Sequence, residues 1–272
     1  MKVSIAKNLG FCFGVKRAID KTMRTKGRVY TLGPLIHNPQ VIKKLEENGK
    51  TVINSIDEVN NGTVIIRTHG VPDSMLKDAE KKNLKIIDLT CPFVKKAQDY
   101  AKKFHSKGYK VFIVGEKEHP EIKGILGNIE NGIVIEKPED VEKIGNYGKA
   151  GVVFQTTLSS DNSKKVVKKL KKKCNELEIA QTICSATSER QKSAKELAKK
   201  VDLMIVIGGR NSGNTKRLVQ SCSSAVETKQ VETGKELKKE WFNGKKHVGI
   251  TAGASTPNCI INNVARRVRN EF

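Results

Sequence analysis

The sequence predicts an α/β protein in which three consecutive units of alternating strands and helices follow one another. Cys12, Cys91 and Cys184 each come after a short β-like run and before a helical pattern of apolar residues. A second strand that ends in glycine follows each cysteine, with the glycine 21, 24 and 24 residues past it. A further strand in each unit enters a small polar loop. Strands separated by helices favour mainly parallel sheets, and therefore an α/β architecture.

The spacing of the repeats places the three units at residues 1–90, 91–183 and 184–272. The predicted strands are rich in β-branched residues, which fit a pleated, buried surface. The runs before the cysteines are 2–5, 84–89 and 177–180, and the glycine-ended strands are 29–33, 111–115 and 204–208. The remaining strands are predicted at 51–53, 133–135 and 229–232, and at 63–67, 151–154 and 247–250. Helical patterns fill most of the intervals.

Composition indicates a soluble globular chain. Its 272 residues are 37% hydrophobic and 29% charged, which is ordinary for a protein with a sizeable core. The N-terminus has no secretory pattern, and apolar runs such as 201–209 are far shorter than the ~20 residues of a membrane helix. We therefore expect a cytoplasmic protein without a membrane partner, whose six cysteines serve as reduced thiols, metal ligands or catalytic groups.

The net charge of +22 raises the possibility of a polyanion partner. Lys greatly outnumbers Arg, however, and the charge is spread along predicted helices. The densest basic run, 164–173, also contains Val166, Val167 and Leu170 at the spacing of one buried helix stripe. We interpret this run as a solvated helix face.

Nine loops follow the predicted strands and carry the unusual residues. Ligands of open α/β sheets gather outside the carboxyl ends of the strands, so three units around one centre would direct these loops at a shared cleft. The second strands lead into loops with His37 and His119 and into the glycine-rich loop 208–215. The strands at 63–67, 151–154 and 247–250 lead into loops 68–72, 155–159 and 251–257, the first of which contains His69.

Three thiolates from three units suit a metal centre, because thiolate sulfur selects zinc, copper(I) or iron–sulfur clusters. A cubane cluster held by Cys12, Cys91 and Cys184 would keep one iron without a protein thiolate, and that iron could polarise a substrate oxygen. The simpler alternative is three unrelated buried cysteines. Their equivalent positions in the repeats favour the metal centre.

The other cysteines lack that equivalence, and we predict that they are not ligands. Cys174 is expected at the end of a lysine-rich helix, Cys222 after a helix, and Cys259 where the last helix begins. His105 and His247 fall outside the loops and are expected on the surface.

Imidazole, hydroxyl and amide groups beside helix N-termini suit a phosphate or diphosphate. Loop 208–215 fits that role, although it is neither a Walker A sequence nor a dinucleotide-binding GxGxxG. Its alternative interpretation is a plain strand-to-helix turn with Ser or Asn caps.

The motifs together resemble one family, the 4-hydroxy-3-methylbut-2-enyl diphosphate reductases, which act last in the methylerythritol phosphate route to isoprenoids. The resemblance covers essentially the whole chain, and its motifs in this order are highly specific. They are residues 11–18, 33–38, 68–71, 88–92, 119–121, 155–159, 184–187, 211–214 and 251–255.

The resemblance implies three pseudo-threefold-related α/β domains in a cloverleaf around a central [4Fe–4S] cluster held by Cys12, Cys91 and Cys184. The unique iron would bind the alcohol of a small allylic diphosphate substrate. Thr156 and Glu121 would serve the hydroxyl end as catalytic residues, with Glu121 in the proton-relay position. The implied diphosphate ligands are His37, His69, His119, Ser212, Gly213, Asn214 and Ser255.

By the same resemblance, the reaction is a reductive dehydroxylation that gives isopentenyl and dimethylallyl diphosphates, with ferredoxin or flavodoxin as electron donor. Two positions depart from the family pattern. Gly213 stands where many relatives have serine, so a backbone N–H or a water would replace one hydroxyl contact. Ser185 stands where relatives often have a larger residue, which would loosen local packing.

Two other functions compete with this interpretation. An RNA- or polyanion-binding protein would use the positive charge, but the 13 aromatic residues are few and no RNA-binding signature is present, which argues against a nucleic-acid partner. A zinc hydrolase would use the three thiolates. Colour separates these possibilities, because an iron–sulfur protein purified without oxygen is brown and a zinc protein is colourless.

Overall fold

The computed structural model describes residues 1–271, with Ser160 described by its backbone only. The chain forms two compact units: unit 1 contains residues 1–16, 36–43 and those from 185 onward, and unit 2 contains residues 17–35 and 44–184. The described residues form three four-stranded sheets, and every strand pair in them is parallel. The predicted α/β class is therefore confirmed.

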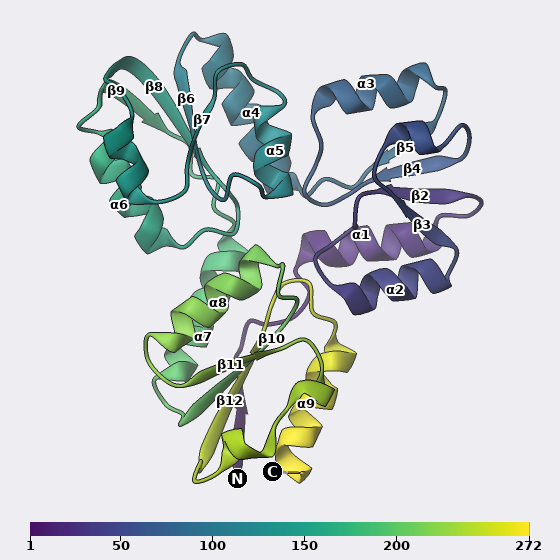
Figure 1. The fold of residues 1–272 in the computed structure, drawn as a ribbon, viewed down its shortest axis with the longest axis vertical. Helices are drawn as coiled ribbons and strands as arrows, with labels where there is room; N and C mark the ends of the chain where they lie inside the picture. Colours follow the sequence, from purple (N-terminus) through teal and green to yellow (C-terminus); the bar gives the residue numbers. More distant parts are fainter. Residues whose placement is uncertain (272) are drawn as a thin grey trace. The chain divides into compact units, whose positions relative to one another are not determined.

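The sheet of unit 1 has the strand order β1-β12-β10-β11 (Figure 1). Lys2 of β1 pairs with His247 of β12, so the first strand of the chain belongs to a sheet with the last. The domain boundaries at residues 90 and 183 stay predictions. The strands are β1 (Lys2–Ile5), β10 (Leu203–Ile207), β11 (Thr228–Val231) and β12 (His247–Ala252), and the helices that follow the cysteine and the two strand ends are α7 (Ser185–Ala198), α8 (Gly213–Ser223) and α9 (Asn258–Asn270).

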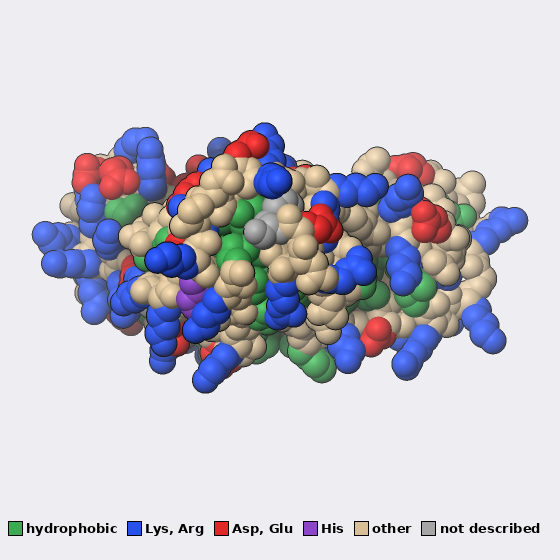
Figure 2. All heavy atoms as spheres, turned by 90° about the horizontal axis from the view of Figure 1, so that it is seen from below, with side chains coloured by type: hydrophobic (Ala, Val, Ile, Leu, Met, Phe, Trp, Pro, Cys, Tyr) green, Lys and Arg blue, Asp and Glu red, His purple; other side chains and the backbone are tan. Residues whose placement is uncertain are grey.

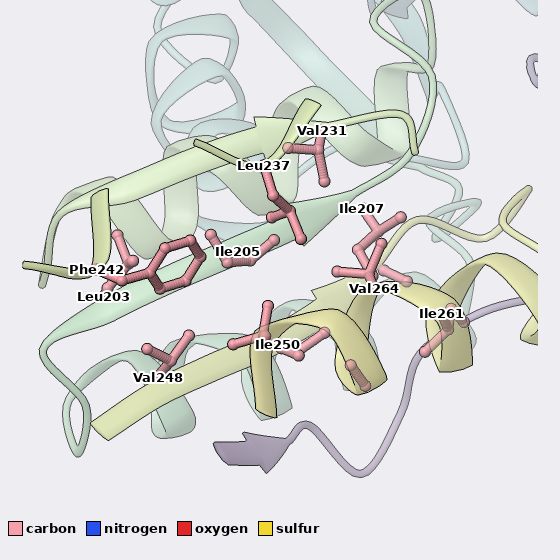
Figure 3. Packing of buried hydrophobic residues seen from close by; sticks show 13 residues of the cluster. Leu203, Ile205, Ile207, Val231, Leu237, Phe242, Val248, Ile250, Ile261 and Val264 are labelled. Carbon is pink, nitrogen blue, oxygen red and sulfur yellow. The ribbon is translucent and has the colours of Figure 1, made fainter. Parts of the chain in front are cut away.

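Strand β10 has five consecutive fully buried residues because helices cover both faces of its sheet. Leu203, Ile205 and Ile207 pack with residues of α9, as Figure 3 shows. Met204 and Val206 point to the opposite face and pack with residues of α7 and α8. This alternation fixes the register of the strand, since a slip of one residue would exchange the two faces.

The first sheet of unit 2 has the order β3-β2-β4-β5. Leu32, Ile53, Val64 and Ile66 form a core with Ala79 of α3. The strands are β2 (Val29–Leu32), β3 (Lys50–Ile53), β4 (Thr63–Ile66) and β5 (Lys85–Asp88), and the helices in this part of the sequence are α1 (Phe13–Arg24), α2 (Pro39–Glu47) and α3 (Asp73–Lys81), with a 3₁₀ turn at Ile56–Glu58.

The second sheet of unit 2 has the order β7-β6-β8-β9. Phe112 and Val114 pack with residues of α6, whereas Val111 and Ile113 face α4 and α5. The strands are β6 (Lys110–Val114), β7 (Ile133–Ile135), β8 (Tyr147–Phe154) and β9 (Cys174–Ile179), and the helices are α4 (Pro92–Ser106), α5 (Pro120–Leu126) and α6 (Ser160–Leu170), with 3₁₀ turns at Pro138–Lys143 here and at Gly234–Glu236 and Lys239–Phe242 in unit 1.

The cysteines outside the repeats differ in part from the prediction. Cys174 does not end a helix, because α6 stops at Leu170 and Cys174 begins β9, where it pairs with Tyr147. Cys222 lies inside α8 rather than after it; burial raises the pKa of its thiol to about 12. Cys259 lies in the first turn of α9, as predicted, and is exposed.

Of the two histidines outside the loops, one agrees with the prediction and the other does not. His105 is exposed near the end of α4, as predicted. His247 is half-buried, because its imidazole hydrogen-bonds the Ser4 hydroxyl across the β1–β12 pair at 2.9 Å.

Within residues 1–271, no helix has both the length and the apolar character that crossing a membrane requires. On the face shown in Figure 2, Lys and Arg side chains are spread over the surface rather than collected in one patch. This distribution agrees with the interpretation of the charge as solvated helix faces.

Candidate functional site

The three repeat cysteines have equivalent surroundings. Each lies directly before the first residue of a helix, at α1, α4 and α7, and each is half-buried. Each backbone N–H also donates to a carbonyl in the loop after β12, β4 or β8: Cys12 to Ala254 at 3.2 Å, Cys91 to Thr68 at 3.0 Å and Cys184 to Thr156 at 3.0 Å. The predicted equivalence is therefore confirmed for the local structure of each cysteine.

In unit 2, the Glu121 carboxylate is 1% exposed and is held by Thr156. The Thr156 backbone N–H donates to one carboxylate oxygen at 2.7 Å, and the Thr156 hydroxyl lies 2.8 Å from the other. Burial raises the pKa of Glu121 to about 7, against the opposing effect of these two hydrogen bonds. A carboxyl group that titrates near neutral pH suits a proton donor.

Two imidazoles of unit 2 lie next to each other, and one of them belongs to the loop before Glu121. His119 is the N-cap residue of α5, and its Nδ1 accepts a hydrogen bond from the Glu121 N–H at 3.2 Å. In the neutral ring the proton is then on Nε2, which can donate to an anion. The ring of His69 lies edge-on to that of His119, with 5.5 Å between centroids. Unit 2 therefore brings His69, His119, Glu121 and Thr156 together.

Gln98 connects the His69 loop to the helix that carries Glu121. Its amide is buried in α4 and donates to the Val71 carbonyl at 3.5 Å. A Cβ at Gly70 would lie 2.8 Å from this amide nitrogen, and one at Gly124 would lie 3.1 Å from it. Gly70 also has φ +71°, a backbone conformation that favours glycine. Nothing in the sequence points to Gln98, because a side chain that contacts backbone groups has no characteristic spacing.

In unit 1, the His37 loop is held by the loops after β10 and β12. The Ser255 hydroxyl donates to the His37 carbonyl at 3.1 Å. A Cβ at Gly209 would lie 2.7 Å from that same oxygen, so only glycine permits the approach. Ser212 is the N-cap residue of α8, and Gly213 is the buried first residue of that helix. Unit 1 thus gathers His37, Ser212, Gly213 and Ser255.

Asn214 is the most informative residue of this group. Its side chain is 4% exposed, and neither amide atom has a hydrogen-bond partner among the described residues. An unpartnered buried amide is costly, so such a group indicates a position prepared for a polar ligand. The adjacent Thr215 packs against Gly208 and Gly253, where a Cβ would lie 2.5 and 2.3 Å from its hydroxyl oxygen.

Two arginines bind the loops that lead into cysteines. In unit 2, Arg17 of α1 donates to the carbonyl of Thr90 at 2.7 Å and to that of Leu89 at 3.4 Å, directly before Cys91. In unit 1, Arg190 of α7 is 4% exposed and donates to the Gly10 carbonyl at 3.0 Å, two residues before Cys12. Arg17 follows Cys12 and Arg190 follows Cys184 in the sequence, but nothing in the sequence indicates these partners.

The Ser185 departure lies at the first residue of α7, where the side chain is exposed. A small residue at this exposed position therefore removes few packing contacts, in contrast to the looser packing that was predicted. Glu118, in the same loop as His119, is also exposed, and it pairs with Lys123 at 2.7 Å.

Comparisons with known proteins agree with these features. The model of the LytB protein family matches residues 3–269. A 4-hydroxy-3-methylbut-2-enyl diphosphate reductase of Geobacter sulfurreducens is 46% identical, with 99% of this chain and 97% of the relative covered. One from Clostridioides difficile is 47% identical, with 99% and 100% covered.

Two solved structures are also similar. One, described as (E)-4-hydroxy-3-methyl-but-2-enyl diphosphate reductase, the terminal enzyme of the non-mevalonate pathway, has a TM-score of 0.71 and 43% identity, and both chains are covered fully. The other is an E-1-hydroxy-2-methyl-but-2-enyl-4-diphosphate reductase from Plasmodium falciparum. It has a TM-score of 0.93 and 31% identity, with 99% of this chain and 87% of that chain covered.

Proposed function

This chain belongs to the LytB protein family, and on that premise we propose that it removes the hydroxyl group of 4-hydroxy-3-methylbut-2-enyl diphosphate by reduction. The substrate alcohol takes up two electrons and two protons, its C–O bond breaks, and water leaves. The products are isopentenyl and dimethylallyl diphosphates, which differ in the carbon that receives the second proton.

One observation supports this function above the others. The Cys184 N–H binds the Thr156 carbonyl, and the Thr156 hydroxyl and N–H bind the Glu121 carboxylate. A buried acid with a pKa of about 7 is therefore connected through one residue to a candidate metal ligand. A reductive dehydroxylation needs a proton source of this kind beside its redox centre.

We assign Cys12, Cys91 and Cys184 as the ligands of a [4Fe–4S] cluster. Their half-buried side chains, each directly before a helix, fit this group, because cysteine sulfurs are the ligands that iron–sulfur clusters take. When bound, the cluster supplies electrons and a Lewis-acidic iron that lacks a protein thiolate.

The remaining residues of the site bind the substrate and move protons. Glu121 in its protonated form donates to the departing hydroxyl group. The Thr156 hydroxyl orients the Glu121 carboxyl group and the substrate hydroxyl group. The Nε2–H of His119 and the Asn214 amide donate to diphosphate oxygens. The complete set proposed for the diphosphate is His37, His69, His119, Ser212, Gly213, Asn214 and Ser255.

Replacing Asn214 by leucine is expected to weaken substrate binding without weakening the fold. The amide has no partner in the described residues, so its removal costs no internal hydrogen bond. One lost hydrogen bond to a charged oxygen should raise KM about 10- to 100-fold. Steady-state kinetics and thermal unfolding test this, with Asn211→Leu, an exposed position in the same loop, as control. A large fall in Tm with unchanged KM would contradict the assignment.

We propose that an acidic protein of the ferredoxin or flavodoxin class delivers the electrons. The net charge of +22 should attract such a carrier and accelerate the encounter more than it strengthens the final complex. Electron delivery should therefore slow as ionic strength rises above the physiological value, at which the Debye screening length is ~8 Å. Stopped-flow rates across a salt series measure this effect, and rates that do not change with salt would exclude it.

The decisive experiment is anaerobic reconstitution with iron and sulfide, followed by a substrate-dependent reduction assay. A brown protein that consumes reductant only when substrate is present supports the proposal. A colourless protein with stoichiometric zinc and hydrolytic activity would favour the zinc hydrolase, and tight salt-sensitive RNA binding without turnover would favour the polyanion-binding protein.

A further inference from the structure

The solvent-facing side of helix α4 begins at a proposed cluster ligand. Cys91 is the N-cap residue of this helix, and its carbonyl accepts the Lys95 N–H at 2.9 Å. A shallow cavity of about 420 Å³ runs along the helix. We name this the α4 surface, and its lining residues are Pro92, Lys95, Lys96, Asp99, Tyr100 and Lys103.

We propose that the α4 surface is the docking site of the acidic electron carrier, an inference that rests on the function proposed above. Residues 92, 96, 99 and 103 are three or four positions apart and therefore share one face of the helix. An electron that enters at the Pro92 end of this surface has a short covalent route to Cys91, because the two residues are adjacent.

The α4 surface combines charge with apolar area. Phe93 is adjacent to Pro92 but outside the cavity lining; it is 39% exposed, and it is one of few large hydrophobic side chains with such exposure among the described residues. The Lys96 ammonium lies 5.8 Å from the centre of the Tyr100 ring. Aromatic area at the centre and charged groups at the rim are typical of protein–protein interfaces.

The internal repeat shows that Lys96 does not make the loop contact of its equivalent in the first unit. It lies five residues after Cys91, as Arg17 lies five residues after Cys12. Arg17 is half-buried and directs its guanidinium to the carbonyls before Cys91. Lys96, in contrast, is exposed and faces the cavity. At the same position of the repeat, Arg17 thus makes an internal contact, whereas Lys96 exposes its charge to solvent.

The charge of the α4 surface fits an acidic protein. Lys95, Lys96 and Lys103 outnumber the single carboxylate of Asp99. Lys95 also pairs with Asp88 at 3.3 Å, yet its side chain remains 61% exposed. Charges of one sign around a concave area raise the encounter rate with a partner of the opposite sign.

The test is a charge reversal on α4 with a matched reversal elsewhere. The double variant Lys96→Glu, Lys103→Glu changes the α4 surface, and Lys165→Glu, Lys168→Glu changes the exposed face of α6 by the same amount of charge. Stopped-flow kinetics would follow reoxidation of a reduced acidic ferredoxin by each cluster-loaded protein, and dithionite would serve as a small reductant.

We expect the α4 variant to accept electrons from the ferredoxin at least about tenfold more slowly at low salt. The α6 variant should change much less, and dithionite should reduce all proteins equally. Equal slowing of the two variants would overturn the proposal, and so would slowing of the α4 variant with dithionite. Failure of the proposed function is distinguishable, because the unaltered protein would then reduce no substrate with either reductant.

A separate observation concerns Arg17 and Arg190, and we infer that both are positioning residues for the cysteine loops. Each lies in the helix that follows one repeat cysteine and binds the loop that precedes another. Hydrogen bonds from a charged donor are about twice as strong as neutral ones, so they order the loops before any cluster is loaded. Their positive charge also favours the more negative, reduced form of a centre bound there.

The variant Arg17→Met tests this inference, with Arg17→Lys as the conservative partner. Without cluster, amide hydrogen exchange at residues 89–91 should become about tenfold faster in Arg17→Met. With cluster, the redox equilibrium should shift about tenfold toward oxidation, which is about 59 mV for one electron, and lysine should restore most of it. Unchanged exchange would refute the ordering role, and an unchanged potential would refute the electrostatic one.

Discussion

Serine in place of Cys12, Cys91 or Cys184 is expected to give a protein that cannot retain an iron–sulfur cluster. A cluster with only three protein ligands loses a third of its attachment with each substitution, and the hydroxyl of serine is a much harder ligand than a thiolate. The purified variants should be colourless and inactive. Iron and sulfide analysis after anaerobic reconstitution measures the loss.

The other three cysteines provide the controls. Cys259→Ser changes an exposed side chain and Cys174→Ser a half-buried one, so both should keep a full cluster. Cys222→Ser places a hydroxyl in a fully buried position and should lower stability by about 1–3 kcal/mol, yet retain iron. Full cluster occupancy in all three variants of the repeat cysteines would refute the ligand assignment.

The strands and the starts of the cysteine helices were predictable because their signals are local. Residues 203–207 are all apolar and precede a glycine, which is the pattern of a buried parallel strand. Pro92 directly after Cys91 favours a helix start, because proline suits the first helical position. In the segment around Cys184 these signals are weaker. Its similarity to the segments around Cys12 and Cys91 allowed the same structure to be predicted there.

The features that the sequence did not reveal depend on contacts between distant residues. Nothing in residues 2–5 indicates that Lys2 pairs with His247, because the partner of an edge strand is selected by tertiary packing. Gln98, Arg17 and Arg190 act on backbone carbonyls, which every residue possesses. The roles of Glu121 and Thr156 came from the family resemblance, whereas the raised pKa requires knowledge of burial.

Glu121→Gln is expected to lower turnover by about 10²- to 10⁴-fold while leaving the cluster in place. Glutamine keeps the size of the side chain and much of its hydrogen bonding to Thr156, but it cannot supply a proton. Glu118→Gln is the matched control, because Glu118 lies in the same loop with its side chain 80% exposed. Substrate should still bind to both variants, which a change in the cluster's spectrum on addition of substrate would report.

The pH dependence of the same pair separates a proton donor from a structural carboxyl group. Burial raises the pKa of Glu121 from 4.5 to about 7, so the native state holds this proton where the unfolded chain has lost it. Stability from this group is complete below about pH 4.5 and is lost as the pH rises to about 7, a change of about 3 kcal/mol. Turnover should fall over the upper part of that range, as the acid ionises.

In Glu121→Gln the pH dependence of stability from this group and that of turnover should both disappear, and in Glu118→Gln both should remain. A Glu121→Gln protein with a complete cluster and near-normal turnover would instead move the proton role to another group, with the Thr156 hydroxyl next in line.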